Sequence, residues 1–423
     1  MPNFSAAGAV TLAMRPQDLL KRSSASIGKD AKDAVKRLAG DLEELIVTQE
    51  NLNLEYPLSG AILHGGHTPP AGCKPTKVHD QQHVHEVSED VHKQLNTILS
   101  LIQEMSSDGA DHHACRSRTP PSDTVELLEG FIAQDLLGQL LAQLAVLEFE
   151  ARKDVMNVCC ALLWSGMPQQ IDKRVVAYLS HHPTIFKLLV EGYANEETAL
   201  HYGVVLRSCA RHAELVDAFL TSGHVMALLR FAQCPKIDIS SDAFYTLREM
   251  LLSHKEVSAK WLERNHREFF GVFNELLISG EYIAERQAQK LLTEMLLDKR
   301  FQKVMLAYVS NERNLQIHMN LLKDRSKVIQ VEAFNVFKIF VANPQKPVRI
   351  QQILHKNKTK LITLLESLQA KKLGDEKVAE ELRAIIDKLH NLSAPSPTTS
   401  STSLGETKAV EERKPARSMK MSL

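Results

Sequence analysis

The segment Gln287-Ala288-Gln289-Lys290-Leu291-Leu292 has two close relatives in the chain, Asp242-Ala243-Phe244-Tyr245-Thr246-Leu247 and Glu332-Ala333-Phe334-Asn335-Val336-Phe337. Aligned on their alanines, at positions 243, 288 and 333, the three segments follow one another every 45 residues. A helical repeat of about 40–47 residues is typical of HEAT and armadillo arrays. A small residue at a fixed point lets one helix pair pack closely on the next. We therefore predict an all-α chain folded as a HEAT/armadillo-like, right-handed helical-repeat solenoid.

Two looser copies, Arg152-Lys153-Asp154-Val155 and Ala199-Leu200-His201-Tyr202, extend the repeat toward the N-terminus. Glycine and proline gather between residues 56 and 91, which favours a loop, and the end of the chain is rich in serine, threonine and proline. We predict four parts: N-terminal helices (1–55), inserted loops with a short helix at about 91–105 (56–122), armadillo-like repeats (123–392) and a disordered tail (393–423).

Composition narrows the function. The chain has 423 residues, with 51 basic and 51 acidic ones. A nucleic-acid-binding protein normally carries a basic surplus that displaces counterions from phosphates, so we expect no nucleic-acid partner. No apolar run approaches the roughly 18 residues of a membrane span, and the first residues lack the charged region of a secretory signal. The six cysteines show no CxxC spacing, which favours a cytoplasmic location.

The later repeats contain the most distinctive sequence, which is Met319-Asn320-Leu321-Leu322-Lys323-Asp324-Arg325-Ser326 followed by Glu332-Ala333-Phe334-Asn335-Val336-Phe337-Lys338-Ile339-Phe340-Val341-Ala342-Asn343-Pro344. An earlier one is Phe149-Glu150-Ala151-Arg152-Lys153-Asp154-Val155. These segments resemble the mouse-protein-25 family, also called the calcium-binding protein 39 or Hym-A class. The resemblance covers roughly 123–392, with the loops of 56–91 and 106–121 as insertions relative to the family.

The resemblance implies a scaffold protein rather than an enzyme, acting in a signalling or cell-polarity complex. Family members bind a Ste20-family kinase or pseudokinase through its Trp-x-Phe type C-terminal tail and stabilise its active conformation. In animals the assembly includes a liver-type master kinase. We therefore expect a cofactor-free kinase activator that acts as a monomer within a hetero-complex. The calcium in one family name has no counterpart here, because no D-x-[DN]-x-[DN]-G loop occurs.

The resemblance further implies a pocket for the partner's tail, made by Tyr282, Arg286 and Lys290 together with Met319. Positions 282, 286 and 290 step by four, so their side chains project from one face of a helix. A cationic pair beside an aromatic ring and a methionine suits a peptide end with an acidic residue between aromatic ones. The pattern alone more often marks an ordinary exposed helix face. Ile237 occupies a position at which relatives often carry an aromatic residue.

A basic run is a second candidate for partner binding. Between Leu321 and Lys360 nine basic residues face two acidic ones, and Lys299 precedes them. Most runs of this kind are solvated helix faces. The alternative is a docking surface for an acidic kinase lobe, and Lys299 belongs to that hypothesis.

The sequence gives little support for a metal site or a catalytic site. Six histidines lie close together around Cys73: His64, His67, His79, His83, His85 and His92. Spacings such as His83-x-His85 could hold Zn²⁺, but no second pair completes a tetrahedral set, so we expect no metal site. The sequence contains no GxxxxGK[ST], GxSxG, HExxH or kinase motif, which favours a non-enzyme.

One alternative function is an armadillo-type adaptor for other protein cargo. Importin-like adaptors carry ladders of asparagine and tryptophan along their groove, and this chain has only Trp164 and Trp261. A kinase scaffold is therefore the favoured hypothesis.

Overall fold

The computed structural model describes residues 24–51, 78–107, 129–164, 171–279, 281–370 and 376–394. All regular structure in these ranges is helical. The first helices are α1 (Ser24–Asn51), α2 (Val78–Ser107), α4 (Leu136–Gln143), α5 (Phe149–Leu162), α6 (Ile171–His181), α7 (Pro183–Glu191) and α8 (Glu196–Cys209). Then follow α9 (Ala213–Thr221), α10 (Val225–Phe231), α11 (Ile237–Leu252), α12 (Lys255–Leu277) and α13 (Tyr282–Leu297). The last are α14 (Gln302–Val309), α15 (Glu312–Leu321), α16 (Lys327–Ala342), α17 (Val348–Lys356), α18 (Lys358–Ala370) and α19 (Glu376–His390). Two 3₁₀ helices, η2 (Gly192–Ala194) and η3 (Lys299–Phe301), lie between them.

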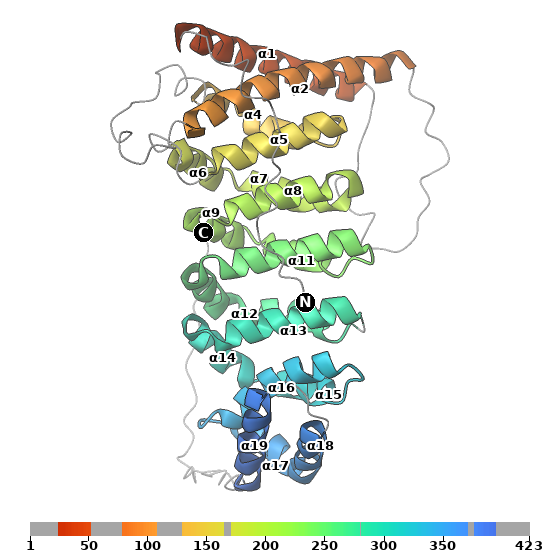
Figure 1. The fold of residues 1–423 in the computed structure, drawn as a ribbon, viewed down its shortest axis with the longest axis vertical. Helices are drawn as coiled ribbons and strands as arrows, with labels where there is room; N and C mark the ends of the chain where they lie inside the picture. The colour runs from red at the N-terminus through yellow and green to blue at the C-terminus, as the bar shows by residue number, and fades with distance from the viewer. Residues whose placement is uncertain are drawn as a thin grey trace, which may run out of the picture.

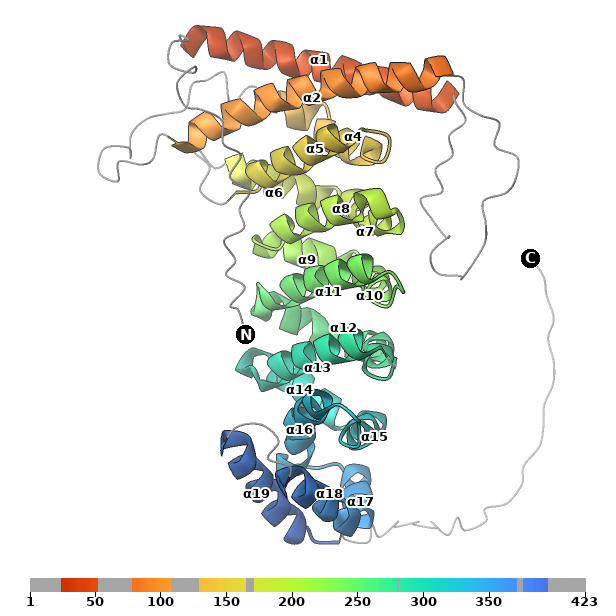
Figure 2. The same cartoon turned by 45° about the vertical axis from the view of Figure 1, so that its right-hand side comes forward.

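The helices stack into an elongated solenoid, which confirms the predicted fold class. The helices α2, α5, α8, α11, α13 and α16 form a ladder in which each packs on the next, and α1 covers the end formed by α2 (Figure 1). The same order is seen after a 45° turn, with α17, α18 and α19 at the opposite end from α1 and α2 (Figure 2). Because each repeat contacts mainly its neighbours, the fold offers extended surfaces for binding.

The predicted repeat register is confirmed. The helices α11, α13 and α16 begin at residues 237, 282 and 327, again 45 residues apart. Ala243, Ala288 and Ala333 occupy the seventh position of these helices and are fully buried. A methyl group at this point lets neighbouring ladder helices approach closely, as the sequence repeat predicted.

Ion pairs join successive helices of the ladder, and one joins α16 to α19. They are Arg152–Glu197 between α5 and α8, Arg207–Asp242 between α8 and α11, Arg248–Glu294 between α11 and α13, and Lys338–Glu381 between α16 and α19. A partly exposed pair such as Arg248–Glu294 contributes about 1 kcal/mol or less, whereas the Arg207–Asp242 pair is largely buried. The charged side chains of these pairs are therefore already engaged by partners within the fold.

The helix α2 differs from the prediction. A short helix was expected at about 91–105 within inserted loops, whereas α2 begins at Val78 and packs against both α1 and α5. The expected parts of the inserted loops at 56–77 and 108–122, and nearly all of the expected tail, fall outside the described residues. The helix α2 is therefore the second layer of the stack and not an appendage to it.

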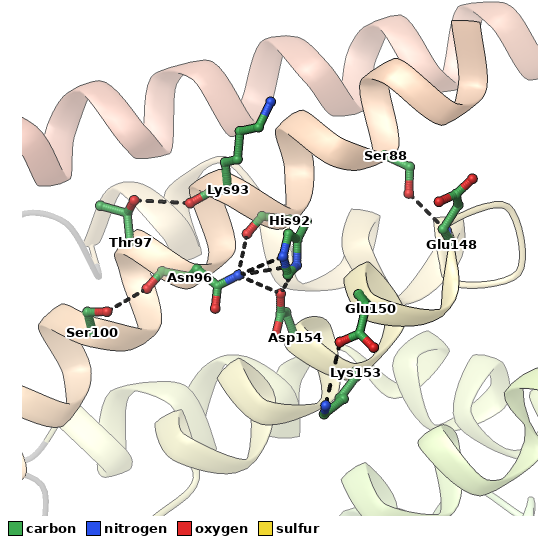
Figure 3. A network of polar contacts seen from close by, with 10 residues as sticks. All are labelled: Ser88, His92, Lys93, Asn96, Thr97, Ser100, Glu148, Glu150, Lys153 and Asp154. Carbon is green, nitrogen blue, oxygen red and sulfur yellow. Dashed lines mark hydrogen bonds and ion pairs between the residues drawn. The ribbon is translucent and has the colours of Figure 1, made fainter. Parts of the chain in front are cut away.

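Polar contacts fix α2 on α5 (Figure 3). The His92 ring and the Asp154 carboxylate are 2.5 Å apart, and the Asn96 amide donates to the same carboxylate oxygen at 3.1 Å. Nearby, the backbone N–H of Glu148 donates to the hydroxyl of buried Ser88 at 2.9 Å. Desolvation raises the pKa of Asp154, because its carboxyl group lies beneath α2.

The early start of α2 has a signal in the sequence. Val84, Val87 and Val91 recur at helical spacing, and Val87 and Val91 are buried. The histidines and acidic residues between these valines keep the overall share of apolar residues low. The helical period is therefore missed when only that share is considered. The glycine and proline cluster therefore predicts a loop only up to the residues that precede Val78.

Candidate functional site

The first candidate surface lies on α11 and α13. Tyr282, Arg286 and Lys290 are all exposed along one side of α13, as the four-residue spacing predicted. The opposite side of α13, which includes Ala288 and Leu292, is buried in the solenoid. The buried side fixes the direction in which the exposed residues project.

The helix α11 adds two exposed apolar residues at equivalent positions. Ile237 lies 45 residues before Tyr282, and Tyr245 lies 45 residues before Lys290. Ile237 is 65% exposed and Tyr245 is 51% exposed. Because α11 and α13 pack side by side in the same register, we call these two residues together with Tyr282, Arg286 and Lys290 the ladder face. Ile237 adds apolar surface to the ladder face.

The charges of the ladder face are not used within the fold. Among the described residues, neither Arg286 nor Lys290 has an ion-pair partner, whereas Arg248 on the neighbouring helix is paired with Glu294. Exposed apolar side chains next to unpaired cations are typical of a protein-binding surface rather than of a solvated helix face.

The second candidate surface is a cavity around Met319. It has a volume of about 370 Å³ and lies where α15 meets α18. Met319, Leu361 and Leu364 supply apolar lining, and the exposed Lys323 and Lys360 also line it. We call it the Met319 cavity. An apolar hollow with cations at its rim suits an aromatic side chain that is followed or preceded by a carboxylate.

Of the four predicted tail-pocket residues, Met319 is the one that lines the Met319 cavity as the structure describes it. No residue of α13 lines the Met319 cavity as the structure describes it. The helix α16 packs against both α13 and α15. The helical spacing found the three residues on α13, but spacing within one helix carries no information about which later helix lies beside it.

Lys299 lies apart from both surfaces, at the start of η3, where it is exposed. The adjoining Asp298 accepts from Lys255 at 2.8 Å, and this hydrogen bond lowers the pKa of Asp298. Arg300 is paired with Glu256, whereas Lys299 has no ion-pair partner in the described part of the chain.

The basic run after Leu321 is less positive than its sequence suggested. Lys338 is paired with Glu381 at 2.6 Å, and Arg349 is paired with Glu312 at the same distance. Desolvation lowers the pKa of Lys346, whose ammonium group donates to the carbonyl of Asn343. These three basic residues are therefore engaged within the fold, whereas Lys323 and Lys360 line the Met319 cavity.

His83, His85 and His92 of α2 pair with carboxylates from different elements. His83 lies 3.2 Å from Glu44 of α1, and His85 lies 2.6 Å from Glu148. The Glu148 hydrogen bond raises the pKa of His85. Across the described ranges, no group of three or more histidine, cysteine or acidic side chains is placed to hold a metal ion. His64, His67 and Cys73 lie outside those ranges.

Comparison with known proteins identifies the family. A family model described as Mo25-like matches residues 72–393. The chain belongs to this Mo25-like family. The match begins at residue 72 and so includes α2 and part of the segment 56–91 that was expected to be an insertion relative to the family. Family membership makes this a scaffold-type protein with protein partners, and its armadillo-like architecture agrees with that role.

Mo25-like relatives from three organisms show how far the similarity extends along the chain. The calcium-binding protein 39-like protein of Mus musculus is 36% identical over 315 residues, which cover 74% of this chain and 89% of the mouse protein. A putative MO25-like protein of Arabidopsis thaliana is 41% identical over 270 residues, covering 63% and 77% respectively. The Mo25-like protein of Schizosaccharomyces pombe is 38% identical over 274 residues, covering 64% and 83%.

Among solved structures, a designed armadillo repeat protein for modular peptide recognition aligns with 60% of this chain and 99% of its own length. The TM-score is 0.39 at 15% identity, too low to carry an argument, and the solenoid is established by the helix packing itself. None of the described helices is both long and apolar enough to cross a bilayer.

Proposed function

We propose that this protein is a non-catalytic scaffold that binds a Ste20-type kinase or pseudokinase and holds it in its active conformation. Membership of the Mo25-like family supports the scaffold role. The observation that carries the proposal is the Met319 cavity, an apolar hollow with two lysines, Lys323 and Lys360, in its lining.

The chemistry of the Met319 cavity matches a Trp-x-Phe type tail. An aromatic side chain of the tail packs on Met319 and Leu361, because a polarisable thioether contacts aromatic rings favourably. An acidic residue of the tail, or its terminal carboxylate, meets Lys323 or Lys360. The apolar floor gives affinity, and the lysines fix the direction of the peptide.

The body of the kinase binds the ladder face. Its exposed residues Ile237, Tyr245 and Tyr282 offer apolar contact, and Arg286 and Lys290 attract an acidic kinase lobe. A surface that binds the active arrangement better than the inactive one shifts the population toward activity. If binding of the scaffold favours the active conformation of the kinase by about 1–3 kcal/mol, kinase activity rises roughly 5- to 150-fold.

We predict that Met319→Ala weakens binding of a peptide ending in Trp-Glu-Phe by roughly 30-fold, because truncation of an interface anchor commonly costs about 2 kcal/mol or more. Lys360→Ala weakens it less, by about 3- to 10-fold, since a lysine at the rim stays partly solvated. Titration of the fluorescent peptide against purified full-length variants measures both effects.

The matched control is Lys260→Ala, which removes an exposed lysine of α12 outside the Met319 cavity. Thermal melting of each variant verifies that it is folded. If all four proteins bind the peptide with equal affinity, the cavity is not the tail site. If the peptide fails to bind wild type at all, the proposed partner class is wrong.

A further inference from the structure

A second hollow lies on α12 and the corner at which α14 ends and α15 begins. Its volume is about 560 Å³, within the range of sites that hold small molecules. Its lining includes residues from the second half of α12, such as Arg267 and Asn274, and residues around the start of α15, such as Arg313 and Asn314. We call it the arginine cavity. It shares no residue with the ladder face or the Met319 cavity.

Part of the lining is a buried polar network. The Asn274 amide donates to the Asn314 side-chain oxygen at 2.9 Å, and the Asn314 amide donates to the Tyr308 carbonyl at 2.9 Å. The Tyr308 hydroxyl donates to the Asn274 oxygen at 3.3 Å and lies 3.0 Å from the His318 ring. Asn274 is 3% exposed and Asn314 is 4% exposed.

This network orients two side-chain amides, each of which keeps one N–H group without a hydrogen-bond partner among the described residues. Each side-chain amide has two N–H groups, and one of them on Asn274 and one on Asn314 is engaged as described. These contacts hold both amides in place, so binding of a ligand to the second N–H group of each costs little side-chain entropy. Buried donors of this kind favour a ligand rich in acceptor oxygens.

The walls of the arginine cavity carry positive charge. Arg267 and Arg313 are both exposed, and within the described ranges neither has an ion-pair partner. No aspartate or glutamate is among the residues that line the cavity in the described structure. Two guanidinium groups from separate helices, without an acidic neighbour in the lining, suit a ligand that carries more than one negative oxygen.

Gly271 keeps one wall open. It lies inside α12, and a Cβ atom built there would meet nothing within 4 Å. Glycine inside a helix costs about 1 kcal/mol relative to alanine, and no close packing requires it here. Gly271 lines the arginine cavity, where the missing side chain leaves room.

We propose that the arginine cavity binds a phosphate-bearing ligand. Arg267 and Arg313 bind the phosphate oxygens, and the amides of Asn274 and Asn314 complete the donor set. The start of α15 contributes a favourable dipole, although one N–H group of its first turn, that of Arg313, already donates to the Asn311 side chain. The ligand is either a free phosphate compound or a phosphorylated side chain of a protein partner, because both present the same group.

Binding is measured by titration calorimetry on the full chain with inorganic pyrophosphate, with a phosphoserine peptide, and with the same peptide unphosphorylated. Arg267→Gln and Arg313→Gln each weaken binding by about tenfold or more, as expected for one lost charge-assisted hydrogen bond. Gly271→Leu fills the cavity and abolishes saturable binding. The control Arg264→Gln removes an exposed arginine of α12 outside the lining and leaves affinity unchanged.

The two probes distinguish the source of the phosphate. Tighter binding of the phosphoserine peptide than of pyrophosphate assigns the arginine cavity to a phosphorylated protein, and the reverse assigns it to a free phosphate compound. The proposal is overturned if neither probe gives saturable binding. It is also overturned if Arg264→Gln weakens binding as much as Arg267→Gln, or if the unphosphorylated peptide binds equally well. None of these outcomes bears on the Met319 cavity.

Discussion

Replacement of Asp242 by alanine is expected to lower the free energy of unfolding by about 2–4 kcal/mol, because it leaves a largely buried cation without its partner. The Asp242 carboxylate lies 2.8 Å from the Arg207 guanidinium and accepts from the Tyr193 hydroxyl at 2.7 Å. Arg207 is only 17% exposed, so water replaces the lost carboxylate poorly. Its remaining contacts, with Thr246 and the face of the Tyr245 ring, are to uncharged groups.

Urea denaturation of wild type and variant measures this difference. Asp238→Ala removes an exposed carboxylate from the same helix and is expected to change stability by about 0.5 kcal/mol or less. Gly203→Ala approaches the same contacts from α8, because a Cβ atom there would overlap the Asp242 carboxylate and crowd the Tyr193 hydroxyl. The double variant should therefore lose less than the sum of the two single losses. Additive losses, or a loss below 1 kcal/mol for Asp242→Ala, would contradict this account.

Acidification is expected to destabilise the protein through His318. This side chain is fully buried, and desolvation lowers its pKa to about 3 from the usual 6.5. The unfolded chain therefore binds one more proton at this position between pH 6.5 and pH 3. Stability from the neutral ring is present above pH 6.5 and is lost as the pH falls below it. At pH 5 the loss is about 2 kcal/mol relative to pH 8, and it depends little on how far the folded pKa lies below 5.

Comparing wild type with the His318→Gln variant isolates the pH-dependent loss of stability that comes from His318. Wild type should lose about 2 kcal/mol more than the variant between pH 8 and pH 5 in urea denaturation. The comparison is needed because His85 acts in the opposite direction, since its Glu148 partner raises its pKa and so favours folding at lower pH. Equal pH dependence of wild type and variant would show that His318 is not held neutral.

Much of the solenoid follows from the sequence because its repeat is local. The alanines at 243, 288 and 333 are buried at the same position of three successive ladder helices, and their spacing therefore reports both the helix type and the stacking. The exposed side of α13 follows for the same reason, because the four-residue step of Tyr282, Arg286 and Lys290 belongs to a single helix.

The remaining features depend on contacts between distant residues. The Met319 cavity needs α18 beside α15, and Leu361 and Leu364 carry no sign in the sequence that they face Met319. Lys338 and Arg349 looked like free charges until their partners, Glu381 and Glu312, were located on other helices. Electrostatic pairing across a fold leaves no periodic trace, whereas burial along one helix does.

The central claim is that this scaffold binds a kinase and raises its activity. The most direct measurement is the activity of a purified Ste20-type kinase that retains its Trp-x-Phe tail, titrated with the full chain. The account predicts a saturable rise of roughly 5- to 150-fold. Arg286→Ala should raise the half-saturating concentration about 30-fold or more, whereas Arg264→Ala, an exposed arginine on α12, should not. Kinase activity that stays flat at concentrations that saturate the tail peptide would contradict the claim.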